Sequence, residues 1–419
     1  MHRRLLLLVP LVSCLILASC GSLQRAPAVP PDATDRVVLL DEPALRTWGD
    51  FASRPFVTEI EAVLGIEVRN QRSQGNMGRL RTSHLLAISG GGSYGAFGAG
   101  ILCGWTERGD RPSFDIVTGI STGALTAPFA FLGPAYDEKL RTVYTTVTTA
   151  DVIAWRGIFD ALFEDSAFYS DPLRRMMEEL IDEPMLAEIA AEYAKGRLLL
   201  VGTTNLDTNR GVIWNMGLIA RASAQGDKEA TKLFHDVLMA SAAIPGAFPP
   251  VMIDVEVDGK KYQEMHVDGG TKTQVFLYPP SFDLIAESRA RGVERDRVAF
   301  VLRNARQSPL WEEVPRRTHA VARRAISGLI HTQGRGDLFR IYSVARRDEM
   351  DFNLALIPDS FTETSDDHFD PVFMSKLFKL GYDSARSDEG YPWLKSPPGW
   401  ADGLRDGEAS DLGVSRQGL

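Results

Sequence analysis

The chain has 419 residues and a formal net charge of −9, with 44% hydrophobic and 24% charged residues. This is the composition of a globular protein, and it excludes a collagen-like, disordered or many-pass membrane chain. The acidic balance also excludes non-specific nucleic-acid binding, which requires a basic surface.

Residues 1–20 (MHRRLLLLVPLVSCLILASC) resemble a bacterial lipoprotein signal peptide. Two arginines precede an apolar run that is too short to span a bilayer, and Leu17–Cys20 resembles a lipobox. We therefore expect residues 1–19 to be removed and the sulfur of Cys20 to carry a lipid that anchors the protein to a membrane. The alternative is an ordinary signal peptide that ends near a cysteine.

The residues after Cys20 bear on where the protein is sorted. They are Gly21 and Ser22, so no acidic residue favours retention in the inner membrane. We therefore expect an exported protein on the outer membrane, facing the periplasm. Cys103 is the only other cysteine of the mature chain, so we expect neither an internal disulfide nor a cysteine-based metal site.

Composition divides the remaining chain into four parts. Residues 20–36 are proline-rich and predict a tether, and residues 37–82 predict an accessory segment with a helix at FVTEIEAVLG. The main domain is expected over 83–385, with its motifs in 83–285. From about 386 to 419 the composition predicts a loose tail.

Within the main domain, strand-like and helix-like segments alternate. HLLAI and FDIVTGI each lead through a glycine turn into a helix of small residues. RLLLVGTTN and DRVAFVLRN are further strands, VMIDVEV and KYQEMHVD are strands or a hairpin, and LFHDVLMASAAI and 311–350 are helical. This order predicts a three-layer α/β/α sandwich with a mainly parallel central sheet. Residues 136–165 and 311–347 could form a lid or touch a membrane.

Gly119-Ile120-Ser121-Thr122-Gly123 matches the G-x-S-x-G nucleophile elbow between a strand and a helix. Small residues on either side of the serine relieve crowding at a sharp turn, and the following helix directs free N–H groups at the site. Ser121 is therefore a candidate nucleophile, and the alternative is an ordinary structural turn.

Ser89-Gly90-Gly91-Gly92 ends the preceding strand. Only glycine lets backbone N–H groups approach a developing oxyanion so closely, so Gly90, Gly91 and Gly92 are candidate oxyanion donors. Gly90, Gly92 and Gly95 also fit the dinucleotide-binding fingerprint. That interpretation needs an acidic residue at the end of the next strand, whereas Asp115 lies at its start.

Asp268-Gly269-Gly270 follows an alternating strand, on a turn where the carboxylate could reach the serine. A simple Asx turn is the alternative. Scattered acidic residues and the lack of a histidine pair at ligand spacing give no sign of a metal site, and nothing indicates a cofactor.

These motifs, in this order, resemble the patatin-like phospholipase family. Ala240–Pro245 (ASAAIP) also resembles the family's A-S-x-A-x-P segment, and the resemblance covers about residues 83–285. It implies a patatin-like α/β/α fold, Ser121 as nucleophile, Asp268 as general base, and the three glycines as oxyanion hole. It also implies a lipid or phospholipid ester as substrate, cleaved through an acyl-enzyme.

The sequence departs from the family pattern at two places. Many members carry a basic residue where this chain has Ser93-Tyr94, and an acidic one where it has Ser89. If the basic residue recognises phosphate, the first departure favours less charged esters.

Two other functions stay open from sequence alone. A Ser-Asp-His triad needs a histidine from among His319, His331 and His368, or His266, which shares a strand face with Asp268. A catalytically silent lipid-binding lipoprotein is the second, although such a protein would be expected to lose Ser121 or Asp268.

Overall fold

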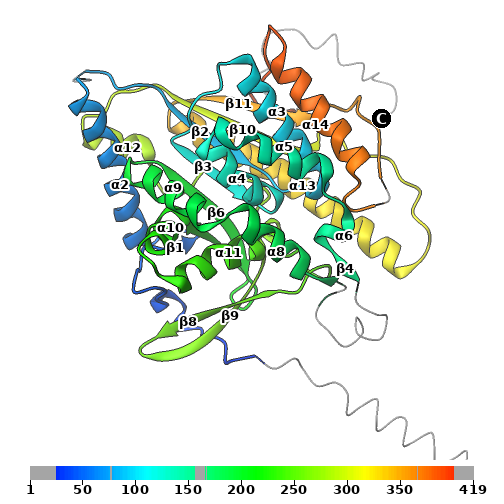
Figure 1. Cartoon of the computed structure of the whole chain (residues 1–419), viewed down its shortest axis with the longest axis horizontal. Coiled ribbons are helices and arrows are strands. Elements are labelled where there is room, and N and C mark those ends of the chain that lie inside the picture. Colours follow the sequence, from blue (N-terminus) through cyan, green and yellow to red (C-terminus); the bar gives the residue numbers. More distant parts are fainter. Residues whose placement is uncertain (1–24, 76–77, 156–165, 167, 366, 401–419) are drawn as a thin grey trace, which may run out of the picture.

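The computed structural model describes residues 25–75, 78–155, 166, 168–365 and 367–400. A nine-stranded sheet forms the middle layer, and helices lie on both of its faces (Figure 1). Along the sheet the strand order is β1-β7-β6-β3-β2-β10-β11, and a β8–β9 hairpin is attached through β9 to β6. This arrangement confirms the predicted α/β sandwich.

The parallel part of the sheet carries the motifs. It consists of β6 (Leu198–Asn205), β3 (Ile116–Ile120), β2 (Ser83–Ile88), β10 (Arg297–Arg306) and β11 (Met350–Ile357). These strands are almost entirely buried because helices cover both faces, which explains their continuous apolar runs. Their carboxyl ends share one edge, so the turns after β2 and β3 lie side by side.

Antiparallel strands extend the sheet on one side. They are β1 (Arg46–Trp48), β7 (Arg210–Asn215), β8 (Val251–Val257) and β9 (Lys260–Asp268). The accessory segment thus supplies the edge strand β1 to the main sheet. A separate two-stranded sheet joins β4 (Ala154–Trp155) to β5 (Phe168–Tyr169).

One layer of helices covers the face toward which Gly119 points (Figure 1). It contains α3 (Gly95–Arg108), α4 (Thr122–Leu132), α5 (Asp137–Thr146), α8 (Asp171–Leu180), α9 (Glu183–Ala194), α10 (Met216–Ala224), α11 (Lys228–Ala242) and α14 (Pro371–Arg386), with the short α6 (Thr149–Val152). Backbone-to-backbone packing of α3 on α14 depends on glycine, since a Cβ at Gly104 would overlap the carbonyl oxygen of Tyr382.

The opposite layer contains α2 (Arg54–Ser73), α12 (Leu284–Ala290) and α13 (Thr318–Arg347). The predicted helix at residues 56–65 lies inside α2. The helix predicted over 311–350 begins only at Thr318 and ends at Arg347, and the strand β11 that follows was not predicted. Of the segment 136–165, residues 137–146 and 149–152 are helical, and 156–165 lie outside the described residues.

Both ends of the described chain pack more closely than composition suggested. In the expected tether, Arg25 pairs with Asp207 at 2.8 Å, so residues 25–36 lie against the β8–β9 hairpin region. In the expected loose tail, Leu394 pairs with Leu354 of β11, and Trp393 packs on the ring of Phe300. An ion pair at the amino end, and a backbone bridge with an aromatic contact at the carboxyl end, account for the difference. Cys20 and residues 1–19 lie outside the described residues.

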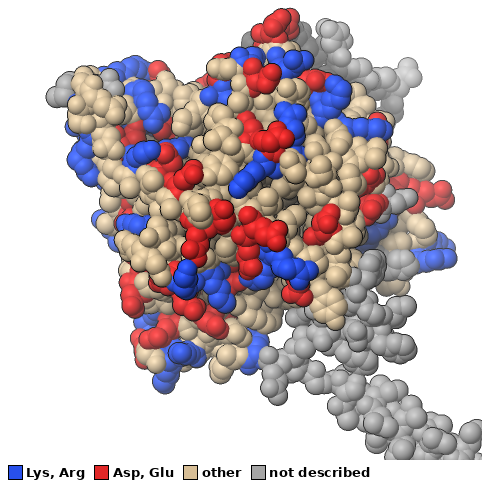
Figure 2. All heavy atoms as spheres, viewed as in Figure 1, with Lys and Arg blue, Asp and Glu red and all other residues tan. Residues whose placement is uncertain are grey.

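Among the described helices, none combines the length and apolar character needed to cross a bilayer. On the face shown in Figure 2, acidic and basic side chains are interspersed, without a broad surface of one sign.

Candidate active site

Ser121 occupies the sharp turn between β3 and α4. Its backbone has φ 55° and ψ −128°, a conformation that a residue with a side chain rarely adopts. The flanking glycines make the turn possible: a Cβ at Gly119 would overlap the carbonyl oxygen of Gly123, and one at Gly123 would overlap that of Ile88. The turn therefore holds Ser121 at the amino end of α4, as the G-x-S-x-G pattern predicts.

Asp268 ends β9 and approaches the same turn. Its carboxylate accepts a hydrogen bond from the Ser121 side chain and another from the Gly270 N–H at 2.6 Å. The Asx turn and the contact with the serine therefore coexist. Gly269 allows the close approach, because a Cβ there would lie 2.5 Å from the carbonyl oxygen of Gly202 in β6.

The electrostatics of Asp268 differ from those of a surface carboxylate. The residue is only 5% exposed, and burial raises the pKa of its carboxyl from 3.8 to about 6, although the two hydrogen bonds act in the opposite direction. At neutral pH Asp268 is thus an ionised carboxylate of unusually high basicity beside a serine hydroxyl. This is the property that a general base requires.

The glycine loop after β2 lies against the serine. A Cβ on Gly90 would lie 3.0 Å from the Ser121 Cβ and 3.7 Å from its Oγ, so the loop borders the hydroxyl directly. The Gly90 N–H, however, donates to the carbonyl oxygen of Gln274 at 3.2 Å, so this predicted oxyanion donor already has an acceptor within the chain. Among the described residues, the N–H groups of Gly91 and Gly92 have no such partner.

Sequence reasoning missed two side chains that hold this geometry. Ser241 of the ASAAIP segment accepts from the Ser121 N–H at 3.0 Å and donates to the Gly202 carbonyl oxygen at 2.7 Å. The same segment anchors the acid, because the Asp268 N–H donates to the Ala243 carbonyl oxygen at 2.9 Å. The sequence shows the motif, but its spacing alone does not indicate that it joins nucleophile and acid.

Asn304, at the end of β10, holds the glycine loop. Its Nδ2 donates to the Ser89 carbonyl oxygen at 3.0 Å, its N–H donates to the Ser89 Oγ at 2.8 Å, and its Oδ1 accepts from the Gly98 N–H. Ser89, where the sequence departs from the family pattern, is thus half of a buried polar pair. Nothing in the sequence around Asn304 indicates this role.

The side chain of His266 hydrogen-bonds neither to Ser121 nor to Asp268. It is fully buried, with Nδ1 3.0 Å from the Thr203 hydroxyl and Nε2 3.1 Å from the Glu264 carboxylate, so both ring nitrogens have partners. Burial lowers the pKa of His266, although Glu264 opposes the shift. No described histidine side chain hydrogen-bonds to Ser121 or Asp268.

The dinucleotide interpretation also fails on geometry. Asp115 lies at the far end of β3 from the glycine loop, where its carboxylate pairs with Arg81 and accepts from the His84 N–H at 3.0 Å. No group of three or more metal-binding side chains occurs among the described residues.

A strained serine, a buried aspartate and a glycine loop at the carboxyl edge of a parallel sheet define a serine hydrolase type of site. Residues 86–278 match the family model described as Patatin-like phospholipase. This match supports a lipid acyl hydrolase activity with a lipid substrate.

Two solved structures show low similarity. The crystal structure of VipD from Legionella pneumophila is 15% identical, with a TM-score of 0.34, over 72% of this chain and 65% of that one. Full-length ExoU with SpcU from the type III secretion system of Pseudomonas aeruginosa is also 15% identical, with a TM-score of 0.25, over 65% and 52%. The matched regions thus span less than two thirds of those chains. No curated protein matches the chain.

Proposed function

We propose that the protein is a serine acyl hydrolase of the lipase or phospholipase A type that works through a Ser121–Asp268 dyad. The observation that supports this proposal best is the hydrogen bond between the Ser121 side chain and a buried carboxylate whose pKa is raised to about 6. Such a carboxylate is ionised at neutral pH yet basic enough to accept a proton in the transition state.

In the proposed reaction, the Ser121 Oγ attacks the ester carbonyl carbon while its proton passes to the Asp268 carboxylate. The carbonyl electron pair moves to oxygen. The N–H groups of Gly91 and Gly92 and the amino end of α4 stabilise the resulting oxyanion. Collapse breaks the ester bond, and the leaving alcohol takes the proton from Asp268. A water activated by Asp268 then hydrolyses the acyl-enzyme.

Hydrolysis by matched variants tests this proposal. The chain, purified in detergent, would be assayed on a short-chain chromogenic ester and on a labelled phospholipid. Ser121→Ala and Asp268→Asn should each lose at least about a thousandfold in kcat. His266→Ala should keep its turnover but lose stability, because it empties a buried polar network. An inactive but folded His266→Ala would support a Ser-Asp-His triad instead.

If the wild type hydrolyses neither ester in detergent or on vesicles, the alternative of a silent lipid-binding lipoprotein gains weight. The preference between the two substrates would show whether Ser93-Tyr94, in place of the family's basic residue, affects substrate charge selectivity. A preference for neutral esters would agree with the missing basic residue.

We also propose that Cys20 carries the lipid that anchors the enzyme, on the sequence features described above. Cys103 provides a matched control, because it is a buried free thiol on α3. In cells fed a labelled fatty acid, Cys103→Ala should retain the label and sediment with outer membranes. Cys20→Ala should lose both, and a labelled, membrane-bound Cys20→Ala would contradict the proposal.

A further inference from the structure

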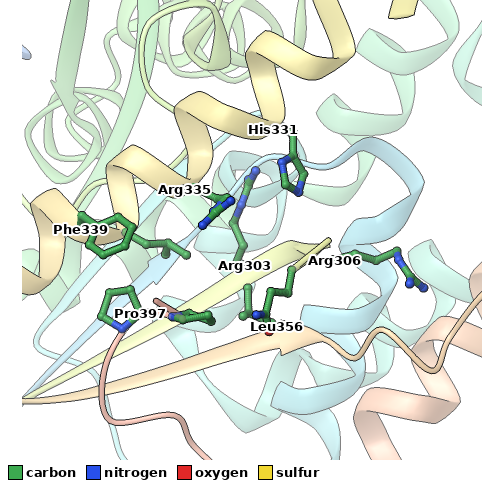
Figure 3. A pocket seen from close by; sticks show the side chains of 10 residues that line it. Arg303, Arg306, His331, Arg335, Phe339, Leu356 and Pro397 are labelled. Carbon is green, nitrogen blue, oxygen red and sulfur yellow. The ribbon is translucent and has the colours of Figure 1, made fainter. Parts of the chain in front are cut away.

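A second polar site lies between the end of β10 and α13 (Figure 3). It is a hollow of about 350 Å³, including its mouth to solvent. Arg303 enters it from β10, and His331 and Arg335 enter it from α13, while Leu356 and Pro397 form part of an apolar wall. Arg306 borders the hollow, but its side chain points away from Arg303, Arg335 and His331 (Figure 3). Arg303 and Arg335 thus bring two positive charges to one hollow in a chain whose net charge is −9.

Arg303 is a buried cation without a full partner. Its exposed fraction is 5%, and its guanidinium makes no hydrogen bond to any described residue. Asp337 attracts its charge, but that carboxylate already accepts from Arg340 at 2.6 Å and from the Gln274 N–H at 2.6 Å. Burial lowers the pKa of Arg303 to about 10, so it stays charged at neutral pH. A charge in this state costs stability unless a ligand pairs with it.

Two side chains of α13 border the same hollow, His331 and the exposed Arg335. The Nε2 atom of His331 is buried without a hydrogen-bond partner, while backbone groups of Arg306 and Gln307 hydrogen-bond to the imidazole ring. Arg303 from β10 and these two side chains from α13 therefore surround one small space.

We infer that this pocket binds a phosphate group, carried either by free inorganic phosphate or by the head group of a lipid. Guanidinium groups match the oxygens of phosphate in pairs, and a tetrahedral anion can use donors from several directions at once. A planar carboxylate has only two oxygens and would leave part of this donor set empty.

The pocket is separate from the Ser121 site. Successive side chains of a strand point to opposite faces. Asn304 points to α3, where it holds the glycine loop, and Arg303 points to α13, where it contacts Gly334. A phosphate in this pocket therefore lies on the other face of β10 from the nucleophile.

Gly334 and Gly336 on α13 offer a matched pair of substitutions. A Cβ at Gly334 would overlap the Arg303 guanidinium, whereas nothing lies within 4 Å of a Cβ at Gly336. Gly334→Ala displaces Arg303 without changing any charge, and both variants replace a helical glycine by alanine. Arg335→Gln removes an exposed donor. Arg323 lies elsewhere on α13 and pairs with Glu312, so Arg323→Gln controls for the loss of a positive charge.

Binding is measured on the full chain in detergent, by titration calorimetry and thermal shift with inorganic phosphate. We expect wild type, Gly336→Ala and Arg323→Gln to bind with similar affinity and to gain in Tm. Gly334→Ala and Arg335→Gln should bind at least tenfold more weakly, with a smaller gain in Tm. Equal binding by Gly334→Ala and Gly336→Ala, or no phosphate binding by the wild type, would overturn the inference.

The same titration with glycerol 3-phosphate distinguishes the two possible ligands, a lipid head group and free inorganic phosphate. Tighter binding of the glycerol ester indicates a lipid head group, and vesicles that contain phosphatidic acid should then retain wild type better than Gly334→Ala. Tighter binding of inorganic phosphate indicates the free ion. Because the readout is binding, failure here leaves the acyl hydrolase proposal untouched, and an inactive enzyme would not remove the phosphate site.

Discussion

The hydroxyl of Ser241 accepts a hydrogen bond from the backbone N–H of Ser121 at 3.0 Å. The same hydroxyl donates a hydrogen bond to the carbonyl oxygen of Gly202 in β6, at 2.7 Å. One buried hydroxyl thus ties the strained turn of the nucleophile to the strand that pairs with β9, the strand of Asp268. The relative position of nucleophile and acid depends on this link.

Ser241→Ala should therefore reduce turnover without touching substrate. It leaves the Ser121 N–H and the Gly202 carbonyl without a partner, at a cost of about 1–3 kcal/mol in stability. We expect kcat to fall roughly ten- to a hundredfold through misplacement of Ser121. Ser223→Ala is the control, because it removes a hydroxyl of α10 that hydrogen-bonds to Thr231 of α11 at 2.7 Å. Unchanged kcat in Ser241→Ala, with stability lost, would make Ser241 purely structural.

The raised pKa of Asp268 predicts how activity depends on pH. If the ionised carboxylate is the base, kcat/KM should rise with pH through about 6 and then level off. A pH–rate profile of the wild type on a neutral ester checks this expectation. A profile that is flat between pH 5 and 8 would contradict the assignment of Asp268 as the titrating base.

The same shift predicts the pH dependence of stability. The folded chain holds the Asp268 proton between pH 3.8 and about 6, whereas the unfolded chain releases it near 3.8. The contribution of Asp268 is therefore most favourable below pH 3.8 and is lost as pH rises through about 6. At pH 8, Asp268→Asn should be more stable than the wild type by on the order of 1–3 kcal/mol, because it removes a buried charge. Urea unfolding at pH 4 and pH 8 measures the difference, which should nearly vanish at the lower pH.

The sequence predicts those parts of this fold that depend on local pattern. Buried parallel strands read as apolar runs, and the glycines around Ser121 and Asp268 indicate turns, so the sheet and the elbow could be placed without a structure. Residues 387–400 could not, because the packing of Trp393 on Phe300 is a long-range contact inside a polar segment.

Within the site, the backbone hydrogen bonds could not be predicted from the sequence. Gly90, Gly91 and Gly92 are equivalent in sequence, and only the acceptor at Gln274 distinguishes Gly90 from the other two. Asn304 and Ser89 meet across β10 and β2, and no spacing along the chain indicates that pairing.

The two remaining donors of the glycine loop differ in how much space surrounds them. A Cβ at Gly91 would overlap the carbonyl oxygen of Asn304, whereas nothing lies within 4 Å of one at Gly92. Gly91→Ala should therefore shift the loop and lower kcat by about a hundredfold or more, the effect of losing an oxyanion donor. Gly92→Ala meets only the backbone cost of its φ of 57°, about 1–2 kcal/mol, and should keep most of its turnover. Equal kcat for the two variants would argue against Gly91 as a donor.

Ser89 and Asn304 should behave as one unit in a double-mutant cycle. Ser89 Oγ accepts from the Asn304 N–H at 2.8 Å and donates to the Gly90 carbonyl oxygen at 2.7 Å, and the Asn304 Nδ2 donates to the Ser89 carbonyl oxygen. Ser89→Ala and Asn304→Ala should each cost about 1–3 kcal/mol in the free energy of unfolding.

Because the two residues share partners, the double variant should cost less than the sum of the single ones, by about 0.5–3 kcal/mol. Loss of kcat should follow the same non-additive pattern while KM changes little, since the pair positions the glycine loop and does not contact substrate. Additive effects on both stability and kcat would show that the two side chains act independently and that another contact fixes the loop.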